Sequence, residues 1–404
     1  MAALAPFRAL RPAPSAAARV AAVPYDVVNA DEARALADGN PLSFLHVSRA
    51  EIDCPRDTDP HSDAVYGKAV ENFDRLKQEA PLVVEETPSI YVYRLHMGDV
   101  TQTGIAACYS LDEYDQDVIK KHERTRPDKE DDRTRHLLAL RVQTGPVFLI
   151  HRSEPAIDRV VDQVVSQTPL YDFVAPDEVR HTVWRVDARL QRPLIDAFAA
   201  LRSLYIADGH HRAASAARAR RHLRAGGANA GAWDTFLAVA FPESQVRILP
   251  YNRVVTDLGD RTPDAFLEAV RQRFAVQEGP AVPMRAGDVS MLVNGTWYTV
   301  TLDQAGGGAA TDRLDVSRLQ DLILNPLLGI GDPRSSTRID FVGGLRGTAE
   351  LERAVQSGRA AVAFSMHPVS VHDLMTIADQ GGIMPPKSTW FEPKLRDGLL
   401  SHTI

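Results

Sequence analysis

The amino-acid sequence predicts a protein of the mixed α/β class. Short runs rich in β-branched and aromatic residues alternate with amphipathic helical runs along the chain, and no internal repeat is visible. Hydrophobic residues make up 44% of the chain and charged residues 25%, which is typical of a globular protein and excludes a disordered, collagenous or membrane-spanning chain. At roughly 150 residues per domain, the 404 residues are expected to form two or three domains.

The first part of the chain is predicted to contain a capped helix, a strand, a long helix and a strand pair. Asn29 lies three residues before Glu32, which is a capping-box spacing, and Gly39 is a suitable helix end. Two alternating apolar runs flank the Gly98-Asp99 turn and are expected to pair. The expected elements after the capped helix are a strand over 41–49, a helix over 62–80, and strands over 89–97 and 103–111.

The rest of the chain continues the alternation of strands and helices. Thr262-Pro263 is a helix start, and Asn294-Gly295 is a hairpin turn. The other expected elements are strand 146–152, helix 157–166, hairpin 179–186, helix 193–201, buried strand 203–207, an alanine-rich helix ending at 222, and strands 236–241 and 246–255.

Charge and cysteine content restrict the partners and the compartment. Acidic residues outnumber basic ones by 53 to 46, and the net charge of -7 disfavours nucleic acid or anionic lipid as a partner. No run approaches the roughly 18 apolar residues of a membrane helix, so no membrane partner is expected. Cys54 and Cys108 could form at most one disulfide, which is typical of a reducing compartment. We expect a cytoplasmic protein, and the sequence leaves a homo-oligomer open.

The first candidate for chemistry is the segment IKKHERTR at residues 119–126. Its basic residues surround one carboxylate, that of Glu123. Such a cluster could bind phosphates while the carboxylate accepts a proton from a hydroxyl group. The alternative is a solvated helix face, which composition alone favours. The acidic residues of 128–133 that follow Pro127 are expected to cap a helix N-terminus, with a magnesium role open.

The second candidate is the segment DGHHR, between a predicted apolar strand and a helix. A strand, a tight glycine turn and a helix N-terminus present free backbone N–H groups where the helix dipole favours anions. Asp208 could hold Mg²⁺ or orient a hydroxyl group, His210 and His211 could donate to phosphate oxygens, and Arg212 could anchor the turn or ligand. The alternative is a histidine pair that only caps the helix. No Walker A, dinucleotide-binding or nucleophile-elbow motif is present.

The proline-framed tail at 381–395 is too irregular for a core element, and it either closes over a ligand or is purely structural.

Together, several segments resemble the bacterial family catalogued as Domain of Unknown Function 1015, over nearly the whole chain. That family is related to the free L-serine kinases, whose nucleotide site is built on a ParB/sulfiredoxin-like fold. The segments are PFRALRP, AAVPYDVV, NPLSFLHV, IKKHERTR with DKEDDR, QTGPVF, LYIADGHHRAASA, LPYNRVV and MPPKSTWFEPKL.

The resemblance implies a domain plan and residue roles. A ParB/sulfiredoxin-like nucleotide-binding core over 111–249 would carry both motifs, between α/β segments at 1–110 and 250–404. Glu123 matches the catalytic glutamate and Asp208 the catalytic aspartate. The implied nucleotide-phosphate contacts are Lys121, His122, Gly209, His210, His211 and Arg212, and the candidate substrate contacts are Asn252, Arg253 and Lys387. Asn252 departs from the related kinases, which carry a histidine-arginine pair at the positions that match 252–253.

The leading functional hypothesis is a kinase that uses ATP or ADP with Mg²⁺ and phosphorylates free L-serine, or a similar hydroxylated acceptor, to O-phospho-L-serine. In this hypothesis Glu123 is the general base, and Asp208 assists through the hydroxyl group or Mg²⁺. One alternative is a phosphohydrolase that acts on phosphoserine or a nucleotide. The other is a ParB-like, nucleotide-gated binding module without metabolic catalysis.

Overall fold

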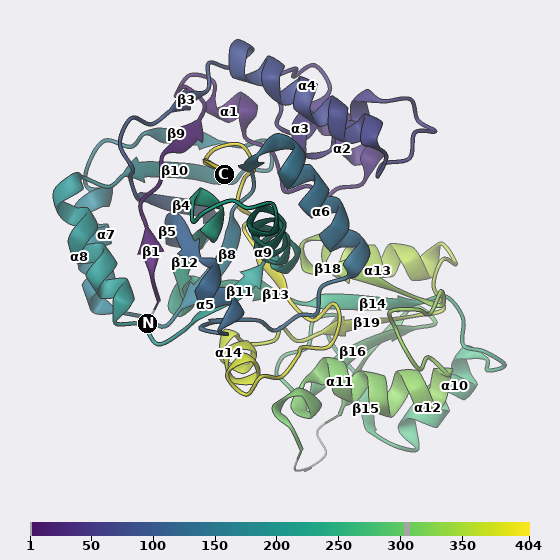
Figure 1. The fold of residues 1–404 in the computed structure, drawn as a ribbon. Coiled ribbons are helices and arrows are strands. Elements are labelled where there is room, and N and C mark those ends of the chain that lie inside the picture. The colour runs from purple at the N-terminus through teal and green to yellow at the C-terminus, as the bar shows by residue number, and fades with distance from the viewer. Residues whose placement is uncertain (1, 303–307) are drawn as a thin grey trace. The chain divides into compact units, whose positions relative to one another are not determined.

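The structure is a computed structural model that describes residues 2–302 and 308–404 (Figure 1). The chain forms two compact units. The first unit comprises the residues up to Val246 together with the C-terminal segment Pro393–Ile404, and the second comprises Arg247–Glu392. The chain therefore leaves the first unit once and returns to it with its last residues.

A nine-stranded mixed sheet forms the centre of the first unit, in the order β6-β11-β8-β12-β5-β4-β10-β9, with β1 beside β5. β6 runs parallel to β11, and β8 runs parallel to β12, whereas β4, β5, β9 and β10 pair in antiparallel fashion. The mixed α/β class is confirmed. The strands are β1 (Leu4–Ala5), β4 (Tyr91–Met97), β5 (Val100–Ser110), β6 (Ile119–Lys120), β8 (Val147–His151), β9 (Tyr171–Val174), β10 (Arg180–Arg185), β11 (Leu204–Asp208) and β12 (Thr235–Pro242).

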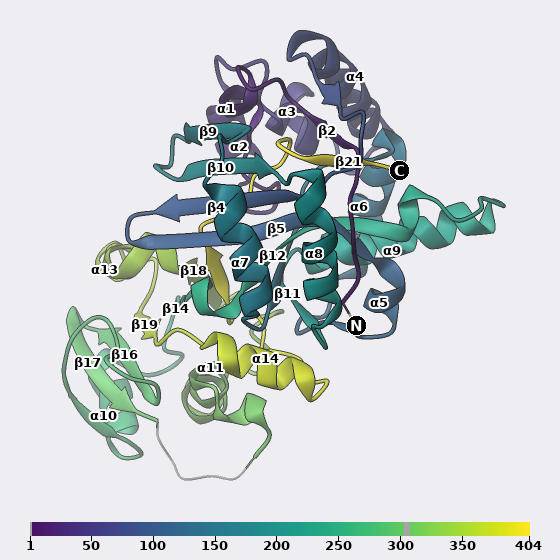
Figure 2. The same cartoon turned by 90° about the vertical axis from the view of Figure 1, so that its left-hand side faces the viewer.

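Helices lie on both sides of this sheet (Figure 1). α7 (Pro155–Val165) and α8 (Ala188–Ala199) lie side by side across one face, as Figure 2 shows, and α6 (Pro127–Leu140) and α9 (His210–Ala225) lie on the other side. Buried aliphatic residues of the strands pack against apolar residues of these helices and form the main core. α5 (Leu111–Asp115) follows β5, and the short helices η2 (Ala232–Asp234) and η3 (Glu243–Gln245) flank β12.

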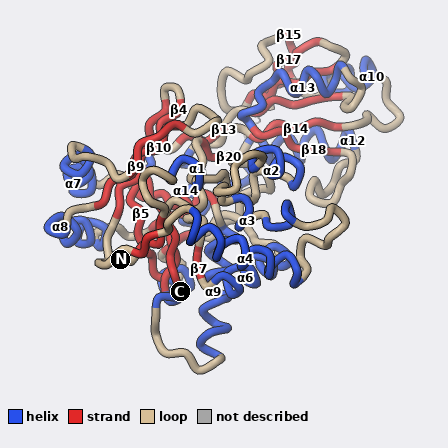
Figure 3. The backbone as a smooth tube through the Cα atoms, turned by 90° about the horizontal axis from the view of Figure 1, so that it is seen from above, coloured by secondary structure: helices blue, strands red, loops and turns tan. Residues whose placement is uncertain are grey.

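The N-terminal helices pack against α6 and form a second core in the first unit. Figure 3 shows α4 next to α6, and α6 next to α9. The predicted strand over 41–49 is wrong: this run forms α3, because Phe44, Leu45 and Val47 are all buried in one helical turn. The helices are α1 (Ala17–Val20), α2 (Ala30–Ala37), α3 (Leu45–Ser48), η1 (Ala50–Asp53) and α4 (Asp63–Glu79).

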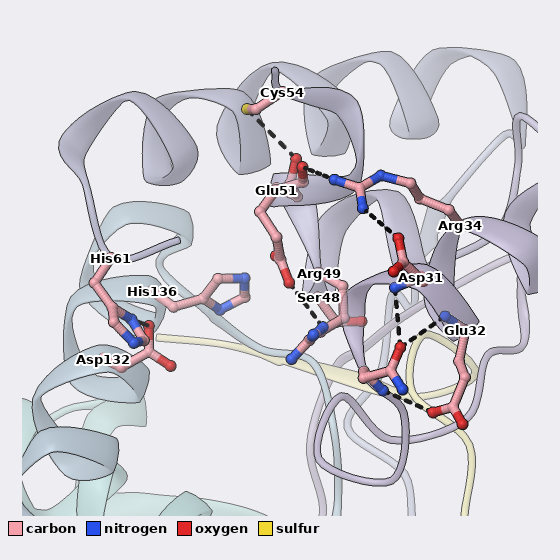
Figure 4. A network of polar contacts seen from close by, with 12 residues as sticks. Asp31, Glu32, Arg34, Ser48, Arg49, Glu51, Cys54, His61, Asp132 and His136 are labelled. Carbon is pink, nitrogen blue, oxygen red and sulfur yellow. Dashed lines mark hydrogen bonds and ion pairs between the residues drawn. The ribbon is translucent and has the colours of Figure 1, made fainter. Parts of the chain in front are cut away.

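Polar contacts join these N-terminal helices to one another and to α6 (Figure 4). The predicted capping box at the start of α2 is confirmed, since Asn29 accepts from the Glu32 amide and the Glu32 carboxylate accepts from the Asn29 amide. In α6, Asp132 accepts hydrogen bonds from Tyr66 at 2.8 Å and from His61 at 3.2 Å. The acidic run at 128–133 thus docks α6 against α4 in addition to supplying acidic residues to the first helical turn.

A small four-stranded sheet closes the first unit, in the order β3-β2-β21-β7. It joins an N-terminal strand, a strand after α4, the strand after α6 and the last strand of the chain. The C-terminal segment is therefore an integral part of the first unit. The strands are β2 (Ala9–Arg11), β3 (Val83–Val84), β7 (Val142–Gln143) and β21 (Ser401–Thr403).

The second unit has its own six-stranded sheet and its own apolar core. The Thr262 cap and the Asn294-Gly295 hairpin turn are confirmed. The strands are β13 (Arg247–Leu249), β14 (Tyr251–Val255), β15 (Ala275–Glu278), β16 (Asp288–Val293), β17 (Thr296–Thr301), β18 (Ile339–Gly343), β19 (Val362–Met366) and β20 (Trp390–Glu392). The helices are α10 (Pro263–Arg271), η4 (Ala310–Arg313), α11 (Asp315–Leu319), η5 (Gln320–Leu324), α12 (Asn325–Leu328), η6 (Gly344–Arg346), α13 (Gly347–Gln356) and α14 (Val371–Asp379).

Three features differ from the sequence expectations. The run 179–186 is one strand, β10, because its hairpin partner is the preceding β9. The run 246–255 splits into β13 and β14, because Pro250 lies between them and has no N–H to donate. The expected domain boundary between residues 110 and 111 falls inside one sheet, because β5, which precedes it, pairs along six residues with β12, which follows it.

Two further observations concern the cysteines and the membrane. Cys54 and Cys108 are both free thiols, and Cys108 is buried in β5. Among the helices that the structure describes, none is long and apolar enough to span a bilayer.

The close approach of β5 to β12 at Gly104 leads to a prediction about stability. A methyl group at Gly104 would lie 2.8 Å from side-chain carbons of Val239 and Phe241. We expect Gly104→Ala to lower the free energy of unfolding by about 1 to 3 kcal/mol through overpacking. Gly67 of α4 has open space around its Cα, so Gly67→Ala is the matched control and should be neutral or slightly stabilising. Equal urea midpoints for Gly104→Ala and the wild type would contradict this account of the packing.

Candidate functional site

The two candidate motifs meet because the strands that precede them are parallel neighbours. Ile119 of β6 pairs with Leu204 of β11, and Lys120 pairs with Tyr205. The carboxyl ends of parallel strands lie at the same edge of a sheet, so Glu123 and the DGHHR turn emerge side by side. The segment 119–126 is thus a short strand and a loop, and it is not a solvated helix face.

The DGHHR turn begins α9 with a glycine in the left-handed region. Gly209 has φ of 94°, and within the described part of the chain no N-cap side chain bonds the first amide groups of the helix. A methyl group at Gly209 would lie 3.0 Å from Nε of Arg212, so a larger residue would meet both backbone strain and a tight contact. The turn therefore leaves backbone N–H groups at the positive end of the α9 dipole.

Histidine side chains from the two motifs are in contact. The imidazole rings of His122 and His210 are 4.4 Å apart, edge to face, and His210 is almost completely buried. The backbone N–H of His122 donates to Nε2 of His210 at 3.4 Å, so the ring proton of neutral His210 sits on Nδ1. That Nδ1 lies 3.7 Å from Oε2 of Glu123, whose side chain is 57% exposed. His210 therefore directs an N–H group toward the one carboxylate of the first motif.

Burial keeps the imidazoles of the site neutral. It lowers the pKa of His122 to about 4, against smaller opposite effects of a backbone hydrogen bond to Ile206 and of the Asp208 charge. Burial also lowers the pKa of His210 far below its ordinary value, and the pKa of His211 is lowered for the same reason. Nε2 of His211 accepts from the Arg126 amide at 3.1 Å, so His211 also carries its proton on Nδ1.

Asp208 is the charged centre of the turn. Its Oδ2 accepts a hydrogen bond from Nζ of Lys394 at 3.1 Å and lies 3.7 Å from Nη2 of Arg212. Burial raises the pKa of Asp208, but the charges of Lys394 and Arg212 and the hydrogen bond from Lys394 outweigh that effect and hold it well below the ordinary value. Arg212 is fixed in turn by a hydrogen bond to the carbonyl of Pro146 at 2.5 Å. Asp208 is therefore ionised, and 26% of its side-chain surface remains exposed.

Lys394 and a second group of the C-terminal segment, Asp397, are site residues that the sequence analysis did not identify. Asp397 is 2% exposed, and its Oδ1 has no hydrogen-bond partner among the residues that the structure describes. Burial raises the pKa of Asp397 to about 7; Arg212, Arg133 and Arg396 act in the opposite direction and Asp26 in the same one. The available signal was the segment MPPKSTWFEPKL, which contains Lys394 and ends two residues before Asp397.

Lys121 does not contact the DGHHR turn in this structure. Its Nζ donates to the carbonyl of Tyr114 at 2.6 Å, lies 3.5 Å from Oδ1 of Asp117, and is 4.2 Å from the centre of the Tyr114 ring. These contacts hold the ammonium group against α5 and the residues that follow it. The phosphate-binding role that the resemblance implies for Lys121 stays a prediction.

Asn252, Arg253 and Lys387 lie in the second unit, where Arg253 and Lys387 are in contact. Oδ1 of Asn252 accepts from the Met366 amide at 3.0 Å, so this buried asparagine has a structural use within the sheet. Nη2 of Arg253 donates to the carbonyl of Lys387 at 3.3 Å, and burial lowers the pKa of Arg253 to about 10. Nζ of Lys387 lies 5.3 Å from the centre of the Tyr251 ring. Their roles toward a substrate stay predictions from the resemblance.

The residues of the first unit fit a phosphate ligand better than a resident metal ion. Neutral Nδ1–H groups, the guanidinium of Arg212 and uncapped helix amides are donors for anionic oxygens. Within residues 2–302 and 308–404, no group of three or more His, Cys, Asp and Glu side chains could hold a metal ion. The single carboxylate of Asp208 suits only a Mg²⁺ ion that takes most of its ligands from phosphate and water.

The fold and the site together define a mixed α/β protein with a charged glycine turn and neutral imidazoles at one sheet edge. The chain belongs to the family described as "Protein of unknown function (DUF1015)", whose model matches residues 4–317. A comparison with curated proteins finds no match.

Three solved structures are among those that match this chain. A free serine kinase mutant in complex with AMP is 14% identical, with a TM-score of 0.37, and the match covers 72% of this chain and 92% of that chain. SbnI with a C-terminal truncation, from Staphylococcus aureus, is 13% identical, with a TM-score of 0.39, and the match covers 72% of this chain and 85% of that chain. A conserved hypothetical protein from Pyrococcus furiosus is 14% identical, with a TM-score of 0.36, and the match covers 73% of this chain and 94% of that chain.

The buried imidazoles make a prediction about acid stability. Because His122 has a pKa of about 4 in the folded protein and 6.5 as its ordinary value, the unfolded chain binds more protons between these values. The contribution of His122 to stability is therefore full above pH 6.5 and decreases as the pH falls toward 4. We expect His122→Asn to make this decrease smaller, although His136, whose pKa burial also lowers to about 4, still contributes. Midpoints of thermal unfolding from pH 4 to 8 test this, and identical pH profiles would refute it.

Proposed function

We propose that the protein is a nucleotide-dependent kinase of a small hydroxylated molecule, with free L-serine as the first candidate acceptor. The observation that carries the proposal is the convergence of a carboxylate and a phosphate-type turn at one sheet edge, where Nδ1 of His210 lies 3.7 Å from Oε2 of Glu123. Membership of the DUF1015 family and the resemblance of both motifs to those of free L-serine kinases support it.

The DGHHR turn supplies what a nucleotide phosphate requires. The first amides of α9 and the Nδ1–H groups of His210 and His211 are neutral donors, and Arg212 adds a positive charge. Neutral imidazoles can donate to phosphate oxygens without titrating near neutral pH, because burial depresses their pKa values. Such preorganised donors stabilise the charge that spreads over the oxygens of a transferring phosphoryl group.

Glu123 is the proposed general base. Its exposed carboxylate can reach the hydroxyl group of an acceptor, and Nδ1 of His210 lies 3.7 Å from Oε2 of Glu123. The acceptor oxygen forms a bond to the terminal phosphorus of the nucleotide, the bond from phosphorus to the leaving nucleotide oxygen breaks, and the hydroxyl proton passes to Glu123. Ionised Asp208 orients the acceptor hydroxyl group or holds Mg²⁺, which would neutralise phosphate charge when bound.

Lys394 has a defined part in this proposal. Its ammonium group neutralises Asp208 in the structure and can exchange that carboxylate for a nucleotide phosphate. Lys121 would have to leave the Tyr114 carbonyl before it could contact a phosphate, so its contribution is expected to be smaller than that of the DGHHR turn.

The test is ³¹P NMR of the full-length protein with Mg²⁺, ATP or ADP, and L-serine. A phosphoserine resonance is expected with the wild type. Glu123→Gln should lower turnover by about 10² to 10⁴-fold, as expected for loss of a general base, while nucleotide binding is retained. Glu86→Gln, at an exposed glutamate outside the site, is the control and should leave turnover unchanged. Equal turnover in Glu123→Gln would remove Glu123 from the mechanism.

The same spectra distinguish the other reaction classes. Release of free phosphate without phosphoserine would replace the kinase by a phosphohydrolase. Nucleotide that binds and stays intact with every acceptor supplied would instead favour a nucleotide-gated binding module. Either result would overturn the kinase proposal.

A further inference from the structure

The segment that carries Glu123 is a short loop between a strand and a helix. This Glu123 loop comprises residues 121–126, follows β6 and ends where Pro127 begins α6. Its residues belong to neither a helix nor a strand, and the Glu123 side chain is 57% exposed. The position of the carboxylate therefore depends on what holds the loop from outside.

The two histidines of the DGHHR turn bind this loop at two points. Nε2 of His210 accepts a hydrogen bond from the amide of His122 at 3.4 Å, and Nε2 of His211 accepts one from the amide of Arg126 at 3.1 Å. One bonded amide lies immediately before Glu123 in the chain, and the other lies three residues after it. The histidine pair, His210 and His211, thus holds the loop on both sides of the carboxylate.

Helix geometry and strand pairing explain how adjacent histidines reach two points of one loop. His210 and His211 are the first two residues of α9, and successive side chains of an α-helix diverge by about 100°. The Glu123 loop and the DGHHR turn leave the sheet at the same edge because β6 and β11 are parallel neighbours. The helices that follow, α6 and α9, continue side by side (Figure 3). The two contacts therefore follow from the pairing of two strand–loop–helix segments.

The far end of the loop is joined to a firm support. Arg126 is the N-cap residue of α6, and the first turns of this helix are bonded to α9. Oγ of Ser215 donates to the carbonyl of Glu130 at 3.3 Å, and Arg218 forms an ion pair with Asp131. The His211 contact thus adds to a set of bonds that keeps the start of α6 against α9.

Both histidine contacts require neutral imidazoles. A neutral imidazole has one N–H group and one acceptor nitrogen, whereas an imidazolium has two N–H groups and cannot accept. Burial lowers the pKa of both His210 and His211 below the ordinary value, so Nε2 keeps its lone pair at neutral pH. Nδ1–H is then the one ring donor that each histidine has left, and Nδ1 of His210 has no hydrogen-bond partner among the described residues.

We propose that His210 and His211 are positioning residues that hold the Glu123 loop through Nε2, and that they thereby link the phosphate-binding turn to the proposed general base. The importance of the link for catalysis rests on the proposed function, in which Glu123 accepts the hydroxyl proton. Each histidine has two separate tasks, because Nε2 bonds the loop and Nδ1–H is available to a phosphate oxygen. A histidine that only contacts phosphate would have no influence on the loop.

Two substitutions of His211 separate these tasks. The carboxamide of glutamine extends about as far from the backbone as Nε2, whereas the carboxamide of asparagine extends about as far as Nδ1. His211→Gln therefore keeps an acceptor for the Arg126 amide and loses the Nδ1 donor. His211→Asn keeps a donor near the position of Nδ1 and loses the acceptor. His222→Asn, at an exposed histidine near the end of the same helix, is the matched control.

The first readout is the kinetics of phosphoserine formation by the full-length protein with Mg²⁺, nucleotide and L-serine. His211→Asn should lower kcat by about 10- to 100-fold, as expected when a reacting group is misplaced, with little change in the KM for the nucleotide. His211→Gln should recover most of that kcat and show a nucleotide KM raised by about tenfold, the factor expected for one lost hydrogen bond. An equal loss of kcat in both variants, or the opposite pattern, would overturn the proposal.

The second readout does not depend on catalysis. Amide hydrogen exchange of the full-length protein without nucleotide should be at least about tenfold faster at Arg126 in His211→Asn than in the wild type, and close to the wild type in His211→Gln and His222→Asn. Thermal unfolding midpoints check that each variant is folded. If His211→Asn is not, His210→Asn and His210→Gln provide the same comparison at the His122 amide. Exchange at these amides that is the same in the asparagine variant and the wild type would contradict the proposal.

The two readouts also separate this inference from the proposed function. If the wild type forms phosphoserine and exchange at Arg126 is unchanged in His211→Asn, the kinase stands and the positioning role fails. If the wild type forms no phosphoserine and exchange at Arg126 is faster only in His211→Asn, the histidine pair holds the loop and the kinase proposal fails.

Discussion

The charge of Asp208 is the constraint on which the rest of the site depends. This carboxylate lies at the end of β11, largely removed from water, and it needs cations to stay ionised. Arg212 supplies one from the first turn of α9, and Lys394 supplies the other from the C-terminal segment. That segment is itself fixed in the first unit by β21 and by buried Arg396, which pairs with Asp177 and donates to His181. The last residues of the chain are therefore part of the site.

Burial divides the titratable groups of the site into two kinds. The imidazoles of His122, His210 and His211 lose their charge because the nearby acidic groups offset their desolvation only in part, and they become neutral hydrogen-bond donors or acceptors. Asp208 keeps its charge because two cations face it, whereas Asp397 holds its proton to about pH 7 because burial dominates. Neutral donors next to fixed charges form an environment that does not need to reorganise when an anion binds.

Much of the site was predictable from local sequence, and the rest depended on long-range pairing. The strand, glycine turn and helix at 204–225 follow from an apolar run, Gly209 and an alanine-rich stretch, and all three are present. The contact of His122 with His210 required the pairing of β6 with β11, which no local pattern specifies. The role of Lys394 depended on the return of the chain to the first unit after the 146 residues of the second unit, Arg247–Glu392. The run at 41–49 was misassigned because its apolar residues suit a strand and a helix equally well.

The central claim is that the segment after β6 and the DGHHR turn form one nucleotide-phosphate site in the first unit. Amide hydrogen exchange of the full-length protein, with and without Mg²⁺ and ADP, measures this directly. The account predicts slower exchange at the amides of residues 121–126 and at those of His210, His211 and Arg212 when the nucleotide is present. Saturating nucleotide that leaves exchange in both segments unchanged, or that protects only residues 247–392, would contradict it.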